Sequence, residues 1–478
     1  MLTLGMLLRM LLDTRKINVS VLSEKLGVSR SVLYRYLSEK VLMPKGVLNK
    51  IAVELMLTPV ETSMLNEAFE AASIGMDKYE CRKIIADIFA GTDFAAKRYG
   101  ADEKFNDDLF ATISAKQSHA LFGTESIGYA IRYVFEEALR HGLNVFVYGQ
   151  PDNELVMSEI ERFVYAADHA QQLKHIYRLC QGETMEIAAP LAFNMNLQKR
   201  LLCIGTPLSR NYFPSFYYDY SISSRKSPIL HPIRIVSNNT TLFFSSDNQK
   251  AVLIQDKEIA GLYFSELENL HESIAPLVFT SNCIDRVYEL SKHNEFSSPE
   301  LTIADEPSAF FARAGAAEML NMMRKEKKAA DSLRKQKEKN TALIKKGMIV
   351  RSYFTIDGLN RFIETGLMAC GYKGNLSRQI IKDYLINICE YAKTYENVSV
   401  NLITEKIVPA LEQYNLFIYN TAEIWQTKKA DLNRLYVLRE KSTVQAISDY
   451  LFNVFPSTLN MLGKTETVSL LESKVAEM

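Results

Sequence analysis

The chain has 478 residues, of which 47% are hydrophobic and 23% are charged, a composition in the ordinary globular range that excludes a fibrous repeat and a wholly disordered protein. At roughly 100–200 residues per domain the length predicts roughly two to four domains, and the formal net charge is +0. The six cysteines are scattered singly, which excludes a zinc site built from C-x-x-C pairs and predicts reduced core residues.

The apolar N-terminal run does not have the features of a targeting signal. Residues 1–12 are mostly apolar, but Arg9 interrupts them and no small-residue cleavage site follows. No stretch approaches the roughly 18 uninterrupted apolar residues of a membrane-spanning helix. We therefore expect a cytoplasmic protein that makes no membrane contact.

The zero net charge hides an uneven distribution along the chain. Residues 1–50 carry nine basic and three acidic residues, a balance of +6. Residues 324–346 carry ten basic and three acidic residues, a balance of +7, so the remainder sums to −13. A basic N-terminal segment on an acidic body is typical of a polyanion-binding module attached to a separate regulatory body.

Three short helices are predicted at the N-terminus. The first should end near the polar run 13–16, and its buried face has leucines at helical spacing: Leu4, Leu7, Leu8 and Leu11. The second is expected to be capped by Ser20 and to end at Gly27, where the chain turns with a positive φ. Ser29 is placed to cap the third helix, which runs over residues 30 to about 39.

The second and third helices have the spacing of a helix-turn-helix. The positions where two such helices meet are apolar: Leu22, Leu26, Gly27, Val28, Leu33 and Tyr36. Ser23 occupies the site that must be small for a close crossing. The third helix then turns outward side chains that can hydrogen-bond base edges and phosphates, and Val32 can touch a thymine methyl group. With two nearby lysines, the candidate DNA-binding residues are Ser29, Arg30, Ser31, Val32, Tyr34, Arg35, Ser38, Lys40 and Lys45.

Two further helices extend this pattern. Pro44 and Gly46 mark a loop, and a fourth helix follows with a buried stripe. That stripe consists of Val47, Leu48, Ile51, Ala52 and Leu55. Residues 58–61, Thr-Pro-Val-Glu, form a capping box with proline at the first helical position of a fifth helix.

With this tail, residues 1–72 resemble the lambda-repressor/Cro-like (XRE-family) DNA-binding domain. The resemblance rests on LSEKLGVSRSVLYRYLSEKVLMPKGVLNKIAVELMLTPVETSMLNEAF. It implies double-stranded DNA as a partner, the third helix in the major groove, and a homodimer that contacts two half-sites about one helical turn apart. The sequence departs from the family in Ser23, where alanine is commoner, and in lacking a glutamine at the start of the second helix. The usual phosphate contact is therefore unassigned.

Two other interpretations of this region stay open. The segment SRSVLYRYLSEK also resembles the recognition helix of TetR-like repressors, which are much shorter proteins without the capped helical tail. A helical bundle without any DNA-binding role is the remaining alternative, because helix-turn-helix patterns also occur by chance.

The rest of the chain is predicted to be a helical segment followed by two α/β (α+β) lobes. Helical spacing runs from residue 76 to about 142, after which short apolar runs alternate with helices, including a long helix over residues 257–274. Where strands follow one another closely, we expect antiparallel pairing. The segments AVLIQDKEIAGLYFSELENL and LYVLREKSTVQAISDYLFNV both predict a strand, a charged turn and a helix, which hints at two related lobes.

The segment between the lobes is predicted to be a basic helical linker. RKEKKAADSLRKQKEKNTALIKK contains neither glycine nor proline, and a solvated helix is the usual meaning of such a charge run, with added phosphate contacts as the alternative. The predicted organisation is therefore multidomain: an all-α helix-turn-helix domain at 1–72, a helical connector at 73–124, a first lobe at 125–300, a linker at 301–347 and a second lobe at 348–478.

No arrangement typical of an enzyme is found in the sequence. It contains no G-x-x-x-x-G-K-[ST] loop, no G-x-G-x-x-G turn, no G-x-S-x-G elbow, no H-E-x-x-H helix and no H-x-K of the phospholipase-D type. The seven histidines are scattered singly and are expected to be surface or packed residues. We expect no catalytic activity, no metal and no cofactor.

One aromatic stretch has two interpretations. It contains Tyr212, Phe213, Phe216, Tyr217, Tyr218 and Tyr220. Strands favour such residues, so a packed strand is the preferred interpretation. A small-molecule pocket or a subunit interface is the alternative.

Together these features predict a sequence-specific transcriptional regulator with a large C-terminal sensing and dimerisation region. Arg30 and Arg35 are the strongest candidates for guanine or phosphate contacts. Besides DNA, the expected partners are a second copy of the chain and a small-molecule or peptide effector. The alternatives are a protein-interaction scaffold that uses the N-terminal helices, and an α/β enzyme of an unfamiliar class with a DNA-binding head.

Overall fold

The computed structural model describes most of the chain. The described residues are 2–90, 117–168, 170–182, 189–205, 211–219, 232–282, 300–307, 341–366, 376–405, 414–419, 422–429 and 431–478. Contacts between residues define one unit built on Met1–Lys83 and a second unit that contains most of the remaining chain. None of the helices in these described segments is long and apolar enough to cross a membrane.

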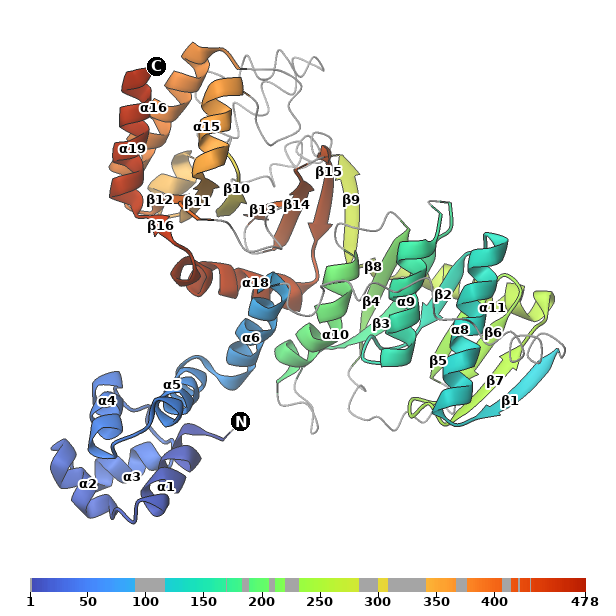
Figure 1. The fold of residues 1–478 in the computed structure, drawn as a ribbon, viewed down its shortest axis with the longest axis horizontal. Coiled ribbons are helices and arrows are strands. Elements are labelled where there is room, and N and C mark those ends of the chain that lie inside the picture. Colours follow the sequence, from blue (N-terminus) through green and yellow to red (C-terminus); the bar gives the residue numbers. More distant parts are fainter. Residues whose placement is uncertain are drawn as a thin grey trace. The chain divides into compact units, whose positions relative to one another are not determined.

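The first unit is a bundle of helices around a leucine-rich core (Figure 1). Its helices are α1 (Leu4–Thr14), α2 (Val19–Leu26), α3 (Arg30–Leu37), α4 (Lys45–Glu54) and α5 (Pro59–Ile74), followed by α6 (Met76–Ala90). The predicted apolar positions are buried or packed against this core. The capping box of α5 is confirmed, since Thr58 and Glu61 exchange hydrogen bonds.

Two helix boundaries differ from the sequence expectation. Asn18, not Ser20, caps α2, and its Oδ1 accepts the N–H of Ser20 at 2.9 Å. Asparagine is as good a cap as serine, and the apolar positions alone do not fix which residue begins the helix. The third helix ends at Leu37 because Glu39 adopts a left-handed backbone with φ 58°.

An arginine ties α1 to α5. Arg15 Nη2 lies 2.7 Å from Glu61 Oε2, and its Nε donates to the carbonyl of Leu55 at 2.6 Å. The hydrogen bond from Arg15, followed by that from Thr58, lowers the pKa of Glu61 to about 2. Glu61 therefore remains ionised at neutral pH and serves both as part of the cap and as an ion-pair partner.

The second unit contains two mixed sheets with helices between the strands (Figure 1). The first sheet consists of β1 (Ser118–Phe122), β2 (Val145–Tyr148), β3 (Leu173–Cys180), β4 (Tyr212–Asp219), β5 (Ile233–Ser237), β6 (Thr241–Phe244), β7 (Lys250–Ile254) and β8 (Ala275–Pro276). Its helices are α8 (Thr124–His141), α9 (Glu154–Ala166), α10 (Pro190–Gly205) and α11 (Lys257–Ser273).

The second sheet follows directly along the chain. Its strands are β9 (Val278–Asn282), β10 (Leu301–Ala304), β11 (Val350–Thr355), β12 (Val398–Ile403), β13 (Tyr414–Tyr419), β14 (Glu423–Lys428), β15 (Asp431–Leu438) and β16 (Met461–Leu462). Its helices are α15 (Ile356–Thr365), α16 (Arg378–Thr394), α18 (Lys441–Asn453) and α19 (Lys464–Glu477), with a short 3-10 turn at Phe455–Thr458.

The described strands of the two sheets have the same connectivity. The first sheet has the order β1-β7-β6-β5-β2-β3-β4-β8 and the second has β9-β15-β14-β13-β10-β11-β12-β16. In each, three neighbouring strands are parallel (β2-β3-β4 and β10-β11-β12) and the other pairings are antiparallel. In each, a helix joins the seventh strand to the eighth, as expected for the two strand-turn-helix segments (β7–α11 and β15–α18). The weak sequence hint of related lobes therefore corresponds to a shared topology.

The sheets divide the chain at positions that differ from those expected. β1 lies in the predicted helical connector but pairs with β7, and β9 lies in the predicted first lobe but pairs with β15. β10 lies in the predicted linker but is a central strand between β11 and β13. The strand partners are far away along the chain, so no local pattern reveals them. Most of the basic run 324–346 lies outside the described residues.

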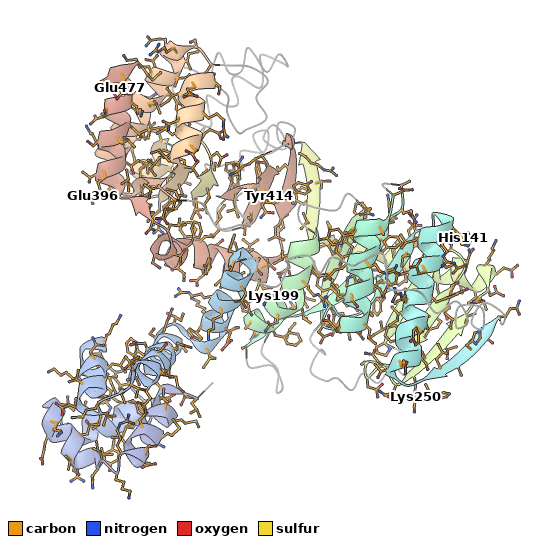
Figure 2. The ribbon with its side chains drawn as sticks, viewed as in Figure 1. His141, Lys199, Lys250, Glu396, Tyr414 and Glu477 are labelled. Carbon is orange, nitrogen blue, oxygen red and sulfur yellow. The ribbon has the colours of Figure 1, made fainter. Side chains whose placement is uncertain are left out.

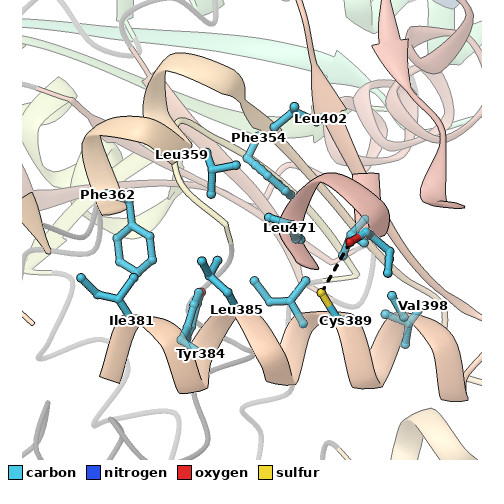
Figure 3. Close-up of a cluster of buried hydrophobic side chains, with 14 of the residues drawn as sticks. Phe354, Leu359, Phe362, Ile381, Tyr384, Leu385, Cys389, Val398, Leu402 and Leu471 are labelled. Atoms are coloured by element: carbon cyan, nitrogen blue, oxygen red, sulfur yellow. Dashed lines mark hydrogen bonds between the residues drawn. The ribbon is translucent and has the colours of Figure 1, made fainter. Parts of the chain in front are cut away.

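The core of the second lobe lies between α15, α16, α19 and the parallel strands. Phe354 of β11 and Leu402 of β12 pack with Phe362, Leu385 and Leu471 from the three helices (Figure 3). Near the end of this layer, the Cys389 thiol approaches the carbonyl oxygen of Val468. Tight packing of this kind holds the strand ends in a fixed position.

A buried carboxylate joins the two lobes. Glu440, only 1% exposed, caps α18 and accepts the backbone N–H groups of Ser442 and Thr443. It also accepts hydrogen bonds from Gln198 of α10, at 3.0 Å, and from the hydroxyl of Tyr218 of β4. Burial alone would raise the pKa of Glu440, but these side-chain donors together hold that pKa below its usual value.

The C-terminal half of α6 packs at the same junction. Asp87 pairs with Lys199 of α10 at 3.1 Å, and Lys199 is labelled in Figure 2. The ring of Phe89 stacks on Tyr450 of α18, with centroids 5.7 Å apart and 13° between the planes. This part of α6 therefore contacts one helix from each lobe.

Replacing Glu440 tests the lobe junction. We expect Glu440→Ala to lower the free energy of unfolding by about 2–4 kcal/mol. The substitution removes the buried acceptor of Gln198 and Tyr218, and it also removes the N-terminal cap of α18. The only tryptophan, Trp425, lies buried in β14 and reports urea unfolding of this lobe by fluorescence.

Glu466→Ala is the matched control, because the Glu466 carboxylate accepts the exposed backbone N–H of Gly463 at the start of α19, and its loss should cost about 1 kcal/mol or less. The depressed pKa of Glu440 adds stability above the unfolded-state pKa, which is lost as the pH falls through the folded-state pKa. Glu440→Gln should therefore lose less stability on acidification than the wild type. Equal losses for Glu440→Ala and Glu466→Ala would refute the junction.

Candidate nucleic-acid interface

The turn between α2 and α3 sets the direction of the third helix. Gly27 ends α2 with φ 69°, a left-handed conformation in which a side chain is strained. The N–H of Val28 then bonds to the carbonyl of Ser23 at 3.1 Å. Ser23 is 2% exposed, and its hydroxyl donates to the carbonyl of Ser20, so the small residue satisfies its own polar atom inside the crossing.

The third helix is held by its inner face. Ser29 caps it as predicted, with its hydroxyl accepting the N–H of Val32 at 3.4 Å. Leu33 and Leu37 are 0% and 3% exposed and belong to the bundle core. Because these leucines are four residues apart, the opposite face of the helix must point to solvent.

The predicted DNA-binding side chains lie on this outer surface. Those with exposed side chains are Ser29, Arg30, Ser31, Tyr34, Arg35, Ser38, Lys40 and Lys45, and Val32 is partly exposed. Seven belong to α3 and its two caps, Lys40 follows the helix, and Lys45 is the first residue of α4. The helical spacing places Arg30, Tyr34 and Ser38 in one row and Ser31 with Arg35 in a neighbouring row.

The basic side chains of this surface are free of ion pairs within the described part of the chain. Arg30, Arg35, Lys40 and Lys45 have no carboxylate partner there, whereas Arg15 and Lys25 of the same bundle are paired with Glu61 and Glu54. An unpaired guanidinium can bind a phosphate or a guanine edge without first breaking an existing bond. This arrangement can therefore attract a polyanion.

The contact between Glu39 and the start of α1 has no signal in the sequence. The carboxylate of Glu39 accepts the N–H of Gly5 at 2.7 Å. The two residues are 34 positions apart, so neither periodicity nor capping rules could pair them. The positive φ of Glu39 carries no signal in its residue type, because glutamate rarely adopts it.

The body of the protein was searched for clusters of metal-ligating side chains and for histidines with an altered pKa. Within the described ranges, no three His, Cys, Asp or Glu side chains converge on a possible metal position. His175 is fully buried, with its ring nitrogens 2.8 Å from the Tyr212 hydroxyl and 3.0 Å from the Gly149 carbonyl, and burial lowers its pKa to about 4. His175 is thus a neutral, packed residue.

The aromatic residues from Tyr212 to Tyr218 lie in strand β4, in agreement with the preferred interpretation of a packed strand. Tyr212 and Phe216 are buried, while Phe213 and Tyr218 are more than a third exposed. The Tyr218 hydroxyl is used in the lobe junction, and Tyr220 lies outside the described residues.

Two kinds of known protein are similar to parts of the chain: solved structures and one domain family. Two solved structures are matched to parts of the chain, both at low TM-scores. TrmBL2, an archaeal chromatin protein, is 11% identical with a TM-score of 0.21, over 52% of this chain and 81% of that protein. Polyphosphate kinase from Porphyromonas gingivalis is 9% identical with a TM-score of 0.22, over 69% of this chain and 48% of that protein. At these scores we infer neither fold nor function from them.

No curated protein sequence matches the chain significantly. The family profile of the Cro/C1-type helix-turn-helix DNA-binding domain matches residues 7–61, which extend from α1 to the start of α5. This is the family that the sequence resembled, and the match covers the capped α3 and its unpaired arginines. The N-terminal bundle is therefore a Cro/C1-type helix-turn-helix DNA-binding domain.

Proposed function

We propose that the chain is a cytoplasmic, sequence-specific transcriptional regulator that binds double-stranded DNA through α3. The observation that carries this proposal is the exposed face of α3, where the guanidinium groups of Arg30 and Arg35 have no partner among the described residues, within a Cro/C1-type domain. In the major groove, a guanidinium can donate two hydrogen bonds to O6 and N7 of guanine. Serine and tyrosine hydroxyls on the same face would fix the register on neighbouring bases and phosphates.

The proposal includes a homodimer. One helix such as α3 contacts only a few base pairs, which is too few to specify a site in a genome. Two copies related by a two-fold axis would contact half-sites about one helical turn apart. We assign dimerisation to the body of the protein, which is much larger than the bundle.

The body is proposed to sense a small molecule or peptide without catalysing a reaction. Support comes from the position of the second half of α6, which contacts α10 through Asp87 and α18 through Phe89. These two helices belong to different lobes and meet at Glu440. A ligand that changes how the lobes meet would therefore change the packing around α6, the helix that follows the DNA-binding domain.

Substitution of the two arginines tests the DNA-binding surface. A target duplex is first selected from a random pool, and its affinity for the full chain is measured by gel shift. Arg30→Ala and Arg35→Ala should each weaken binding roughly 5- to 150-fold, which corresponds to about 1–3 kcal/mol for a lost bidentate contact. Arg140→Ala, on α8 of the body, is the control and should bind as the wild type does. Unchanged binding by both α3 variants would show that α3 is not the DNA-binding surface. It would favour the alternative that the N-terminal helices serve a protein-interaction scaffold.

Lys45 tests the phosphate contribution separately. Lys45 lies at the start of α4, where the side chain of Pro44 provides no cap, so both the ammonium and the helix N-terminus favour an anion. Lys45→Ala should weaken binding to every duplex by a similar factor and reduce the slope of log K against log salt by about 0.9. Lys257→Ala in α11 should leave that slope unchanged. A slope that stays the same in the Lys45 variant would remove this residue from the interface.

A further inference from the structure

The first turn of α1 contacts the end of the DNA-binding helix. The N–H of Gly5 donates to Glu39 Oε1 at 2.7 Å, and Glu39 lies two residues after the last residue of α3. A Cβ atom at Gly5 would lie 2.3 Å from the carbonyl oxygen of Leu37 and 2.8 Å from Glu39 Oε1. Only glycine therefore allows α1 to come this close to the end of α3.

The bond is made by a residue in a strained conformation. Glu39 has φ 58°, a left-handed backbone that costs an ordinary side chain about 1 kcal/mol. The N–H of Gly5 is one of the four at the start of α1 that have no partner within the helix. A carboxylate at this position also interacts favourably with the positive end of the helix dipole. The hydrogen bond gives the N–H of Gly5 its partner, and this gain offsets the cost of the strained backbone at Glu39.

The charge of Glu39 is unfavourable for DNA binding itself. Glu39 is exposed and lies between the basic residues Arg35 and Lys40 in the sequence. Its carboxylate has no ion pair to another described residue, so its negative charge repels phosphates near α3. An acidic side chain at such a position is best explained by the bond that it makes to Gly5.

We propose that Glu39 is a positioning residue for α3. By binding the N-terminus of α1, Glu39 fixes the orientation of α3 in the bundle. It thereby sets how well the domain discriminates between base sequences, and not its affinity for phosphate. Small displacements matter here because a bidentate contact to a base edge tolerates little change in angle or distance. This inference rests on the proposed DNA-binding function of α3.

Two conservative variants separate the bond from the charge. Glu39→Gln keeps a carbonyl oxygen at the same distance from Gly5 and loses the charge. Glu39→Asp keeps the charge, but its shorter side chain lacks one methylene and does not reach the N–H; aspartate also tolerates positive φ. For each full-length variant, gel shift gives the affinity for the selected duplex and for a scrambled duplex of equal length. Hydrogen exchange of the Leu33 and Leu37 amides verifies that the bundle remains folded.

We expect Glu39→Asp to reduce discrimination between the two duplexes about tenfold while its affinity for the scrambled duplex stays at the wild-type level. Glu39→Gln should keep discrimination within about twofold of the wild type and bind both duplexes more tightly. Gly5→Ala should behave like Glu39→Asp, whereas Gly261→Ala, at a position with no atom within 4 Å of the added carbon, should behave like the wild type.

The outcomes separate this inference from the proposed function. A wild type that does not discriminate between the duplexes overturns the proposed function, and the positioning role with it. A wild type that discriminates together with a Glu39→Asp variant that discriminates equally well overturns the positioning role alone. The same conclusion follows if Glu39→Gln loses as much discrimination as Glu39→Asp, because the glutamine keeps the bond to Gly5, and that bond would then not be what sets discrimination.

Discussion

The burial of Leu33 and Leu37 determines what the N-terminal domain presents to its surroundings. Because one face of α3 is buried in the core, the residues on the opposite face are exposed to solvent. The remaining features of the bundle maintain this orientation. The turn at Gly27 sets where α3 begins, the cap at Ser29 satisfies its first turn, and Glu39 connects its end to α1. An ordered helix with an exposed basic face loses little conformational freedom on binding, which favours affinity.

Features of the DNA-binding domain that depend on neighbouring residues could be predicted from the sequence. Leucine spacing, the glycine turn and the capping box are local patterns, and each predicted its structure. The choice of Asn18 over Ser20 was missed because both can cap a helix that starts within two residues of the same place. The contact between Gly5 and Glu39 could not be predicted, since it joins residues that only the folded bundle brings together.

The body shows the same limit more strongly. The strand-turn-helix segments were recognised, but the partner of β9, and one of the two partners of β10, lie more than a hundred residues away along the chain. Pairing of this kind depends on the whole sheet and not on a window of sequence. Once the partners are known, the shared strand order of the two lobes becomes evident. The lobes then meet through Glu440, a residue whose sequence context shows only that it precedes a helix.

Recognition of a base sequence by α3 is the property on which the proposed function rests. Selection of bound duplexes from a random DNA library by the full-length chain tests this claim directly. We expect enrichment of a motif with two related half-sites, their centres about one helical turn apart, and loss of that motif when Arg30 and Arg35 are both replaced by alanine. A library that stays random after repeated selection, or the same motif enriched by the doubly substituted chain, would contradict it.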